Sequence, residues 1–135
     1  MNRPMLIEQP IPVRAYEIDA MGIVSNIVYV KWFEDLRHGY LDKYYPYSRM
    51  LKEGKSPMLM KTEIEYKAPL TIHDEPVGRL WVIKFGRTKW VMQFEISTGS
   101  KVHCLGKQTG CFYDLEKEGI TTVPEDLLAE YNKAI

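Results

Sequence analysis

The chain lacks the features that mark several common classes of protein. Its eighteen basic and eighteen acidic residues cancel, so no overall field favours nucleic acid or an anionic membrane. Its longest uncharged run, residues 20–30, has eleven residues, against the roughly 20 apolar residues that cross a bilayer. The first twelve residues contain no apolar segment typical of a secretion signal. We therefore expect a soluble cytoplasmic protein that binds neither nucleic acid nor membrane and recognises any anion locally.

Patterns for metal binding and redox chemistry are missing too. Two cysteines, Cys104 and Cys111, stand seven positions apart with no Cys-x-x-Cys pattern. The three histidines, His38, His73 and His103, are neither spaced as a ligand set nor placed beside a serine or cysteine nucleophile. We expect the cysteines to be core or edge residues and the histidines to be structural or exposed. The sequence predicts no metal site and no bound cofactor.

The clearest secondary-structure signal that is present is a long amphipathic helix over residues 27–44. Apolar residues recur at the i, i+3, i+4, i+7 spacing of one buried helix face. They are Tyr29, Trp32, Phe33, Leu36 and Tyr40. Pro46 ends this helix because proline cannot continue it. A short helix over residues 48–53 is predicted to follow and to stop at Gly54.

The rest of the chain is predicted to form mainly strands. The predicted strands after the helix are 61–68, 77–85, 89–96 and 101–113, with turns at 86–87, 98–100 and 118–119. Residues 13–18 are a further predicted strand before the helix, and 123–133 are a final helix with a proline near its start. No repeat or linker interrupts the 135 residues, so we expect one domain over residues 1–135. This order predicts an α+β domain in which an antiparallel sheet wraps one long helix.

The most informative segment runs from Asp19 through Gly22 to Asn26 and connects the predicted strand to the long helix. It places a carboxylate beside the unpaired backbone N–H groups of a helix start. Such N–H groups can hold a carbonyl oxygen while the carboxylate acts on the carbonyl carbon or on water. Hydrolysis of an activated acyl group is the leading hypothesis.

Structural interpretations of the same residues stay open. Asp19 could cap its own turn through backbone amides, as aspartates before glycine often do. Ser25 and Asn26 are good N-cap residues, and a cap can coexist with substrate binding. Two acids further along the helix, Glu34 and Asp35, fit a solvated face or structural pairing.

Several ordered motifs resemble the hotdog-fold thioesterases of the 4-hydroxybenzoyl-CoA thioesterase type. The motifs are Tyr16-x-x-Asp19-x-x-Gly22-x-Val24-x-Asn26-x-x-Tyr29-x-x-x-x-Glu34, Ile64-x-Tyr66-Lys67-x-Pro69-Leu70-x-x-x-Asp74, Gly86-Arg87-Thr88, Gly106, Asp114 and Val123-Pro124-Glu125. They cover nearly the whole chain. The resemblance implies a hotdog fold, protomers that join edge strands into one continuous sheet, and acyl-CoA or acyl-carrier thioesters bound at the interface between them.

The resemblance also implies roles for individual residues. Asp19 matches the catalytic aspartate, either as nucleophile or as base for water. Asn26 matches the position whose backbone N–H faces the thioester oxygen, and Gly22 matches the glycine of the tight turn. The chain departs from the pattern at three positions: Glu17 stands where many members have a first aspartate, Met21 where a small residue is common, and Asn26 where one subgroup has histidine. A histidine-assisted step is therefore not carried over.

Substrate-binding residues are expected after the Asp19–Asn26 motif in the sequence. They are Tyr29, Tyr66, Lys67, Arg87, Thr88 and Lys89. In the family the Tyr66–Lys67 stretch lies near bound pantetheine and nucleotide, although Pro69 would also end a strand here for structural reasons alone. Arg87 and Lys89 offer two cations for a coenzyme A phosphate. Scattered surface cations explain them equally well.

These observations together predict a thioester hydrolase that releases a free acid and a thiol. Coenzyme A is the expected leaving group, no cofactor is needed, and the expected assembly is a homodimer or homotetramer. The alternative is a hotdog module that binds acyl thioesters without cleaving them. A hydratase ranks third because no Asp-x-x-x-x-His pattern stands near Asp19. The acyl group, the choice between coenzyme A and a carrier protein, the role of Asp19 as nucleophile or base, and the pathway stay open.

Overall fold

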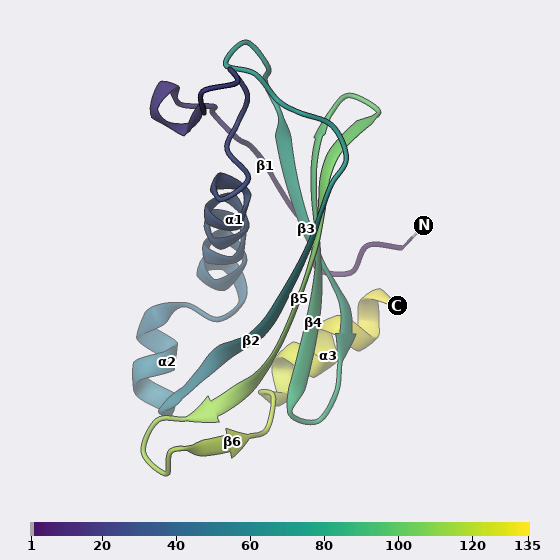
Figure 1. Ribbon diagram of the computed structural model, residues 1–135. Coiled ribbons are helices and arrows are strands. Elements are labelled where there is room, and N and C mark those ends of the chain that lie inside the picture. Colours follow the sequence, from purple (N-terminus) through teal and green to yellow (C-terminus); the bar gives the residue numbers. More distant parts are fainter. Residues whose placement is uncertain (1) are drawn as a thin grey trace.

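The computed structural model describes residues 2–135 and shows an α+β arrangement (Figure 1). The elements in chain order are β1 (Ile7–Pro10), a 3₁₀ turn η1 (Ala15–Glu17), α1 (Val28–Tyr44), α2 (Tyr47–Glu53), β2 (Lys55–Tyr66), β3 (Val77–Phe85), β4 (Lys89–Thr98), β5 (Lys101–Asp114), β6 (Gly119–Thr121) and α3 (Glu125–Ala134). The strand order is β1-β3-β4-β5-β2, with β6 on β5, and every pair is antiparallel. The sheet curls around α1, as the hotdog resemblance predicts.

The long helix carries the expected buried stripe. Tyr29, Trp32, Phe33, Leu36 and Tyr40 are the buried residues of α1. They pack against inward-facing residues of the sheet to form one core with Leu80, Val82, Trp90, Phe94 and Ile96 among its members. The helix therefore buries its apolar face against the concave side of the sheet, and the alternation of the strands supplies the opposite wall.

Two glycines on the inner face of β5 allow this close packing. A Cβ atom at Gly106 would lie 2.3 Å from the ring of Phe33, and one at Gly110 would lie 2.2 Å from the ring of Trp90. Phe33 stacks on Phe94 of the neighbouring strand with ring centroids 4.7 Å apart. The missing side chains let the helix and the aromatic residues approach the strand backbone.

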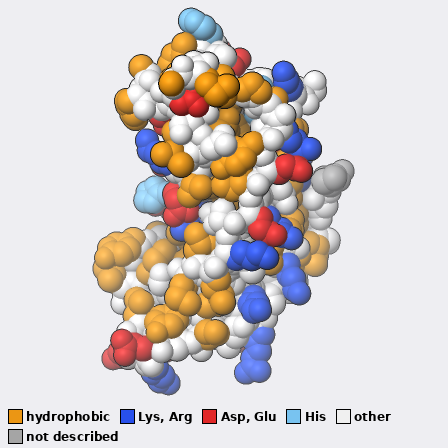
Figure 2. Space-filling model, viewed as in Figure 1, with side chains coloured by type: hydrophobic (Ala, Val, Ile, Leu, Met, Phe, Trp, Pro, Cys, Tyr) orange, Lys and Arg blue, Asp and Glu red, His pale blue; other side chains and the backbone are white. Residues whose placement is uncertain are grey.

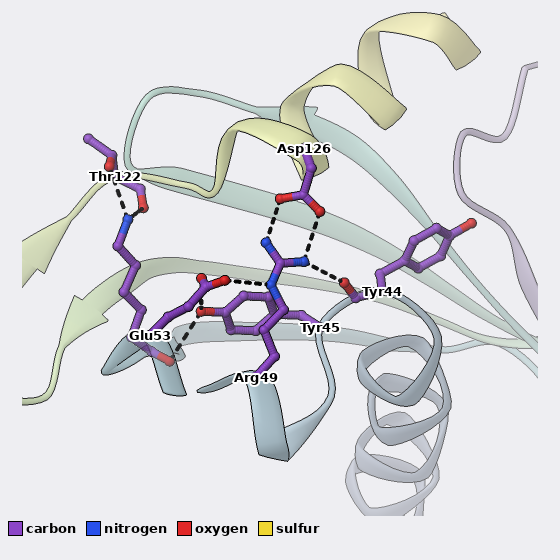
Figure 3. Close-up of polar contacts among 7 residues, drawn as sticks. Tyr44, Tyr45, Arg49, Glu53, Thr122 and Asp126 are labelled. Carbon is purple, nitrogen blue, oxygen red and sulfur yellow. Dashed lines mark hydrogen bonds and ion pairs between the residues drawn. The ribbon is translucent and has the colours of Figure 1, made fainter. Parts of the chain in front are cut away.

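Arg49 of α2 binds the start of the C-terminal helix α3 (Figure 3). Arg49 of α2 donates to both carboxylate oxygens of Asp126 at 2.8 and 2.5 Å and to Glu53 at 2.7 Å. Its guanidinium also lies over the ring of Tyr45. Arg49 holds the pKa of Glu53 and of Asp126 below the usual range. At its other end α3 lies beside β3, where the Tyr131 hydroxyl donates to the carbonyl of Ile83 at 3.1 Å.

Two expectations about secondary structure were wrong, and strand β1 was not predicted. Residues 13–18 are not a strand: they contain the turn η1, and only Ile18 forms an isolated bridge, to Val24. The strand before the helix is instead β1, which was not predicted because prolines in and near it disfavour a strand. Proline is tolerated there because β1 lies at the sheet edge. Strand β2 begins six residues earlier than expected, because a bulge between Leu59 and Lys61 breaks its alternation.

Gly106 provides a test of the helix–sheet contact. Replacing it with Ala places a methyl group against Phe33, so we expect the free energy of unfolding in urea to fall by about 1–3 kcal/mol. Gly119→Ala is the matched control, because nothing lies within 4 Å of its Cβ position. Equal stability of the two variants would contradict the packing described here.

Candidate active site

The Asp19 motif forms a small hairpin at the N-terminal end of α1 (Figure 1). The Ser25 N–H donates to the carbonyl of Glu17 at 2.9 Å, and the Asp19 N–H donates to the carbonyl of Ile23 at 2.8 Å. At the tip, the Gly22 N–H donates to the carbonyl of Asp19 at 3.0 Å. Gly22 has φ = 79°, a conformation that a side chain would strain. The hairpin therefore holds Asp19 at the start of a tight turn.

The Asp19 carboxylate uses one of its two oxygens to hold this turn. Its Oδ1 accepts hydrogen bonds from the backbone N–H groups of Met21 at 2.9 Å and Ile23 at 3.3 Å. No residue within the described range 2–135 donates to Oδ2, and the residue is exposed. Asp19 therefore caps its turn through Oδ1, and Oδ2 remains available to react with a substrate or a water molecule.

The interpretation of Ser25 and Asn26 as N-cap residues of the helix was wrong. Helix α1 begins at Val28, its N-cap residue is Ile27, and no side chain caps it. The N-cap lies after Ser25 and Asn26, so their side chains precede the position from which a cap acts. In the part of the chain that the structure describes, neither the Asn26 nor the Ile27 N–H donates to a protein acceptor. These two donors are available to a ligand.

A groove brings four of the predicted site residues together. Its volume is about 220 Å³, and its lining residues are Ile23, Val24, Asn26, Tyr29, Tyr66, Lys67, Ala68 and Pro69. Asn26 and Tyr29 come from the start of α1, whereas Tyr66 and Lys67 come from the end of β2. Asp19 and Gly22 belong to the hairpin whose returning limb supplies Ile23 and Val24. The hairpin, the helix start and the end of β2 therefore meet at one place.

Two tyrosines in the groove play different parts. The Tyr66 hydroxyl donates to the carbonyl of Asn26 at 3.0 Å, which ties β2 to the helix start. Tyr29 packs edge-on against Tyr66 and is buried. This burial raises the pKa of the Tyr29 hydroxyl to about 12, and Cys104 adds a smaller effect in the same direction. Its hydroxyl stays protonated at neutral pH. Across residues 2–135 that hydroxyl has no hydrogen-bond partner, so it can donate to a ligand.

His103 contacts the backbone of two residues that line the groove, Lys67 and Pro69. His103 is buried on β5; its Nδ1 lies 3.1 Å from the carbonyl oxygen of Pro69, and its Nε2 lies 2.7 Å from Oγ1 of Thr98. The carbonyl of His103 accepts the Lys67 N–H at 2.9 Å. The structural role expected for this histidine is confirmed. Cys104 and Cys111 are buried free thiols of the same strand, also as expected.

The other three predicted binding residues lie elsewhere. Arg87, Thr88 and Lys89 lie at the turn between β3 and β4, at the far end of the sheet from the hairpin (Figure 1). There the Arg87 carbonyl accepts the Val123 N–H and the Thr88 carbonyl accepts the Phe112 N–H. A single chain does not bring this turn to the groove, so its contact with substrate stays a prediction.

Comparison with known proteins identifies the family. Residues 13–131 match the family model described as the thioesterase-like superfamily. The chain belongs to this superfamily. None of the helices within residues 2–135 is long and apolar enough to span a membrane.

Individual relatives carry related descriptions. A Bacillus subtilis protein described as "Putative acyl-CoA thioesterase YneP" is 32% identical over 66% of this chain and 65% of its own length. An Aquifex aeolicus "Putative esterase" is 41% identical over 46% of this chain and 49% of its own length. The chain thus spans about half to two thirds of these relatives. Among solved structures, a DHNA-CoA thioesterase from Staphylococcus aureus has the same fold, with a TM-score of 0.83, 22% identity and coverage of 95% of this chain and 89% of that one.

Phenylalanine substitutions can test which tyrosine hydroxyl is free. Tyr66→Phe removes the bond to the Asn26 carbonyl, so we expect a loss of about 0.5–1.5 kcal/mol in the free energy of unfolding. Tyr29→Phe removes a hydroxyl with no partner in the described chain and should change stability by less than about 0.5 kcal/mol. Urea unfolding of the two variants measures the difference, and a larger loss for Tyr29→Phe would reverse the assignment.

Proposed function

We propose that this protein hydrolyses acyl-CoA thioesters to a free acid and coenzyme A, with Asp19 as its catalytic carboxylate. The observation that carries the proposal is the Oδ2 of Asp19, which accepts no hydrogen bond within residues 2–135. Asp19 lies on a hairpin that leads directly to N–H groups at the start of α1 with no acceptor in the same range. Membership of the thioesterase-like superfamily supports this reaction, as does the description of the Bacillus subtilis relative. Within that superfamily the Asp19, Gly22 and Asn26 motif favours the 4-hydroxybenzoyl-CoA thioesterase type.

In the proposed reaction the thioester carbonyl oxygen faces the Asn26 N–H. The partial positive charge of the helix start stabilises the oxyanion that develops there. Asp19 either attacks the carbonyl carbon or removes a proton from the attacking water. In both routes the carbon–sulfur bond breaks, the thiol leaves, and water supplies the acid hydroxyl and the proton on sulfur. The Tyr29 hydroxyl offers a further donor to the bound thioester.

A second copy of the chain completes the proposed site. Strand β2 has twelve residues and pairs only with β5, so its other edge is unpaired within the described chain. Large apolar side chains of the segment that contains Asp19 are mostly exposed: Tyr16 at 78%, Met21 at 81% and Ile27 at 82%. Figure 2 shows hydrophobic side chains gathered at this end of the molecule. Pairing of two β2 edges would form a homodimer and cover part of this apolar surface.

Asp19→Asn tests the catalytic role. Asparagine keeps an oxygen that can accept the turn hydrogen bonds, so we expect a folded protein whose kcat is about 10²-fold lower. Release of free thiol from a panel of acyl-CoA substrates measures the rate. Asp114→Asn is the matched control, because Asp114 accepts backbone N–H groups at 2.9 Å in a turn at the other end of the fold.

The two variants together separate catalysis from turn formation. A folded Asp19→Asn protein with a rate within a few-fold of the parent would refute the catalytic role. A parent that binds acyl-CoA without turning it over would instead support the non-catalytic binding module.

Lys67→Glu tests recognition of the coenzyme A phosphates. Lys67 lies in the groove and is partly exposed, so one charge reversal should raise KM several-fold for an acyl-CoA and leave KM for the same acyl group on pantetheine unchanged. The Arg87→Glu/Lys89→Glu double variant should show the same selectivity if the turn of a second chain reaches the nucleotide. Equal effects on both substrates would place the phosphates elsewhere.

A further inference from the structure

A second carboxylate lies two positions before Asp19, in the opposite environment. Glu17 is only 4% exposed, whereas Asp19 is exposed. A buried carboxylate is costly unless its oxygens are paired. Glu17 meets that requirement: Oε1 accepts the Arg14 N–H at 2.7 Å, and Oε2 accepts the indole Nε1–H of Trp32 at 3.2 Å and lies 3.6 Å from Nζ of Lys31.

These contacts join three parts of the chain around the site. Arg14 belongs to the segment that enters the hairpin, and Trp32 and Lys31 belong to α1. The main-chain carbonyl of Glu17 accepts the Ser25 N–H of the returning limb. Trp32 in turn packs edge-on against Tyr29 of the groove, with ring centroids 5.1 Å apart. The bond from Glu17 to Trp32 therefore closes a loop of chain that contains both Asp19 and Asn26.

We propose that Glu17 is a positioning residue: its carboxylate fixes the Asp19 hairpin against α1 and so sets Asp19 relative to the unpaired N–H groups at the helix start. This role rests on the proposed thioester hydrolysis. Glu17 touches no substrate in this scheme and acts only through Asp19 and the helix. A displacement of about 1 Å at such a site can cost about 10²-fold in rate.

The chemistry of the two donors explains why a carboxylate is needed. The Arg14 amide and the Trp32 indole can only donate, and they approach different oxygens of Glu17. Glutamine has nearly the same shape but one acceptor oxygen, so its NH₂ group would face one of these N–H donors. Glu17→Gln thus removes the anchoring with almost no change in volume. Trp32→Phe removes only the indole donor and keeps an aromatic ring.

The kinetic test uses Glu17→Gln alone and together with Asp19→Asn. We expect Glu17→Gln to lower kcat by about ten- to a hundredfold with a smaller change in KM, and Trp32→Phe to act in the same direction. In the Asp19→Asn background Glu17→Gln should cause no further loss, because residues that act through one group are not additive. Additive losses would overturn the proposal and leave Glu17 with a purely structural role.

Glu53→Gln controls for a general loss of stability. Glu53 is a carboxylate bonded by Arg49 and Tyr45 at the other end of α1, away from the groove. Rates are therefore compared per folded molecule, with the folded fraction taken from urea unfolding. The Glu53 variant should keep the parental kcat, and an equal loss of kcat in both variants would overturn the proposal.

Amide hydrogen exchange tests the anchoring without relying on enzyme activity. In Glu17→Gln the N–H groups of Asp19 and Ser25, which form the hairpin ladder, should exchange faster, while that of Gly54, which bonds to Met50 at the other end of the fold, should not change. Unchanged exchange at Asp19 and Ser25 would overturn the proposal. If the parent does not hydrolyse thioesters, this measurement still decides whether Glu17 holds the hairpin.

Discussion

The arrangement of this protein depends on the close contact between α1 and β5. Phe33 of α1 occupies the space that a side chain at Gly106 would need, and Trp90 of the neighbouring strand β4 does the same at Gly110. This contact lets one sheet curl around one helix and bury the whole apolar face of that helix. The position of the helix then decides where its unpaired N-terminal N–H groups lie. Gly106 thus allows the close approach of the helix whose start lines the candidate active site.

The two ends of α1 are built differently. At the C-terminal end, the Arg49 contacts with Asp126 and Glu53 close the fold, and the apolar cavity beside Tyr40 and Tyr45 holds only about 10 Å³, room for at most about one water molecule. At the N-terminal end, the groove beside Asn26 holds about 220 Å³. Charged contacts stabilise one end of the domain, whereas the other end keeps backbone donors and a carboxylate oxygen that have no partner within residues 2–135.

The hairpin uses two carboxylates for two purposes. Both carboxylate oxygens of the buried Glu17 accept hydrogen bonds from protein donors, whereas only one oxygen of Asp19 accepts hydrogen bonds, from the backbone of its own turn. The residues are two positions apart, yet their environments differ because Glu17 faces α1 and Asp19 lies at the tip of the loop. Rigid support and an available reactive group are therefore provided by neighbouring residues of the same segment.

Much of this could be read from the chain itself. The apolar spacing from Tyr29 to Tyr40 determined α1, and Gly54 determined the end of α2, because both signals are local. The Asp19, Gly22 and Asn26 motif located the tight turn before α1, and the ordered motifs along the chain indicated the thioesterase superfamily. The short strand β1 and the bulged start of β2 escaped prediction, since edge position and strand pairing override local pattern.

The tertiary structure alone decided how the site is assembled. Nothing in the local sequence shows that Tyr66 reaches Asn26, forty residues earlier, or that Glu17 is buried on Trp32. It also separated Arg87 and Lys89 from the groove that contains Tyr66 and Lys67, although the sequence predicted all four as substrate-binding residues. The residue types and the helix period are properties of the chain itself, whereas contacts between distant segments depend on how the sheet curls around the helix.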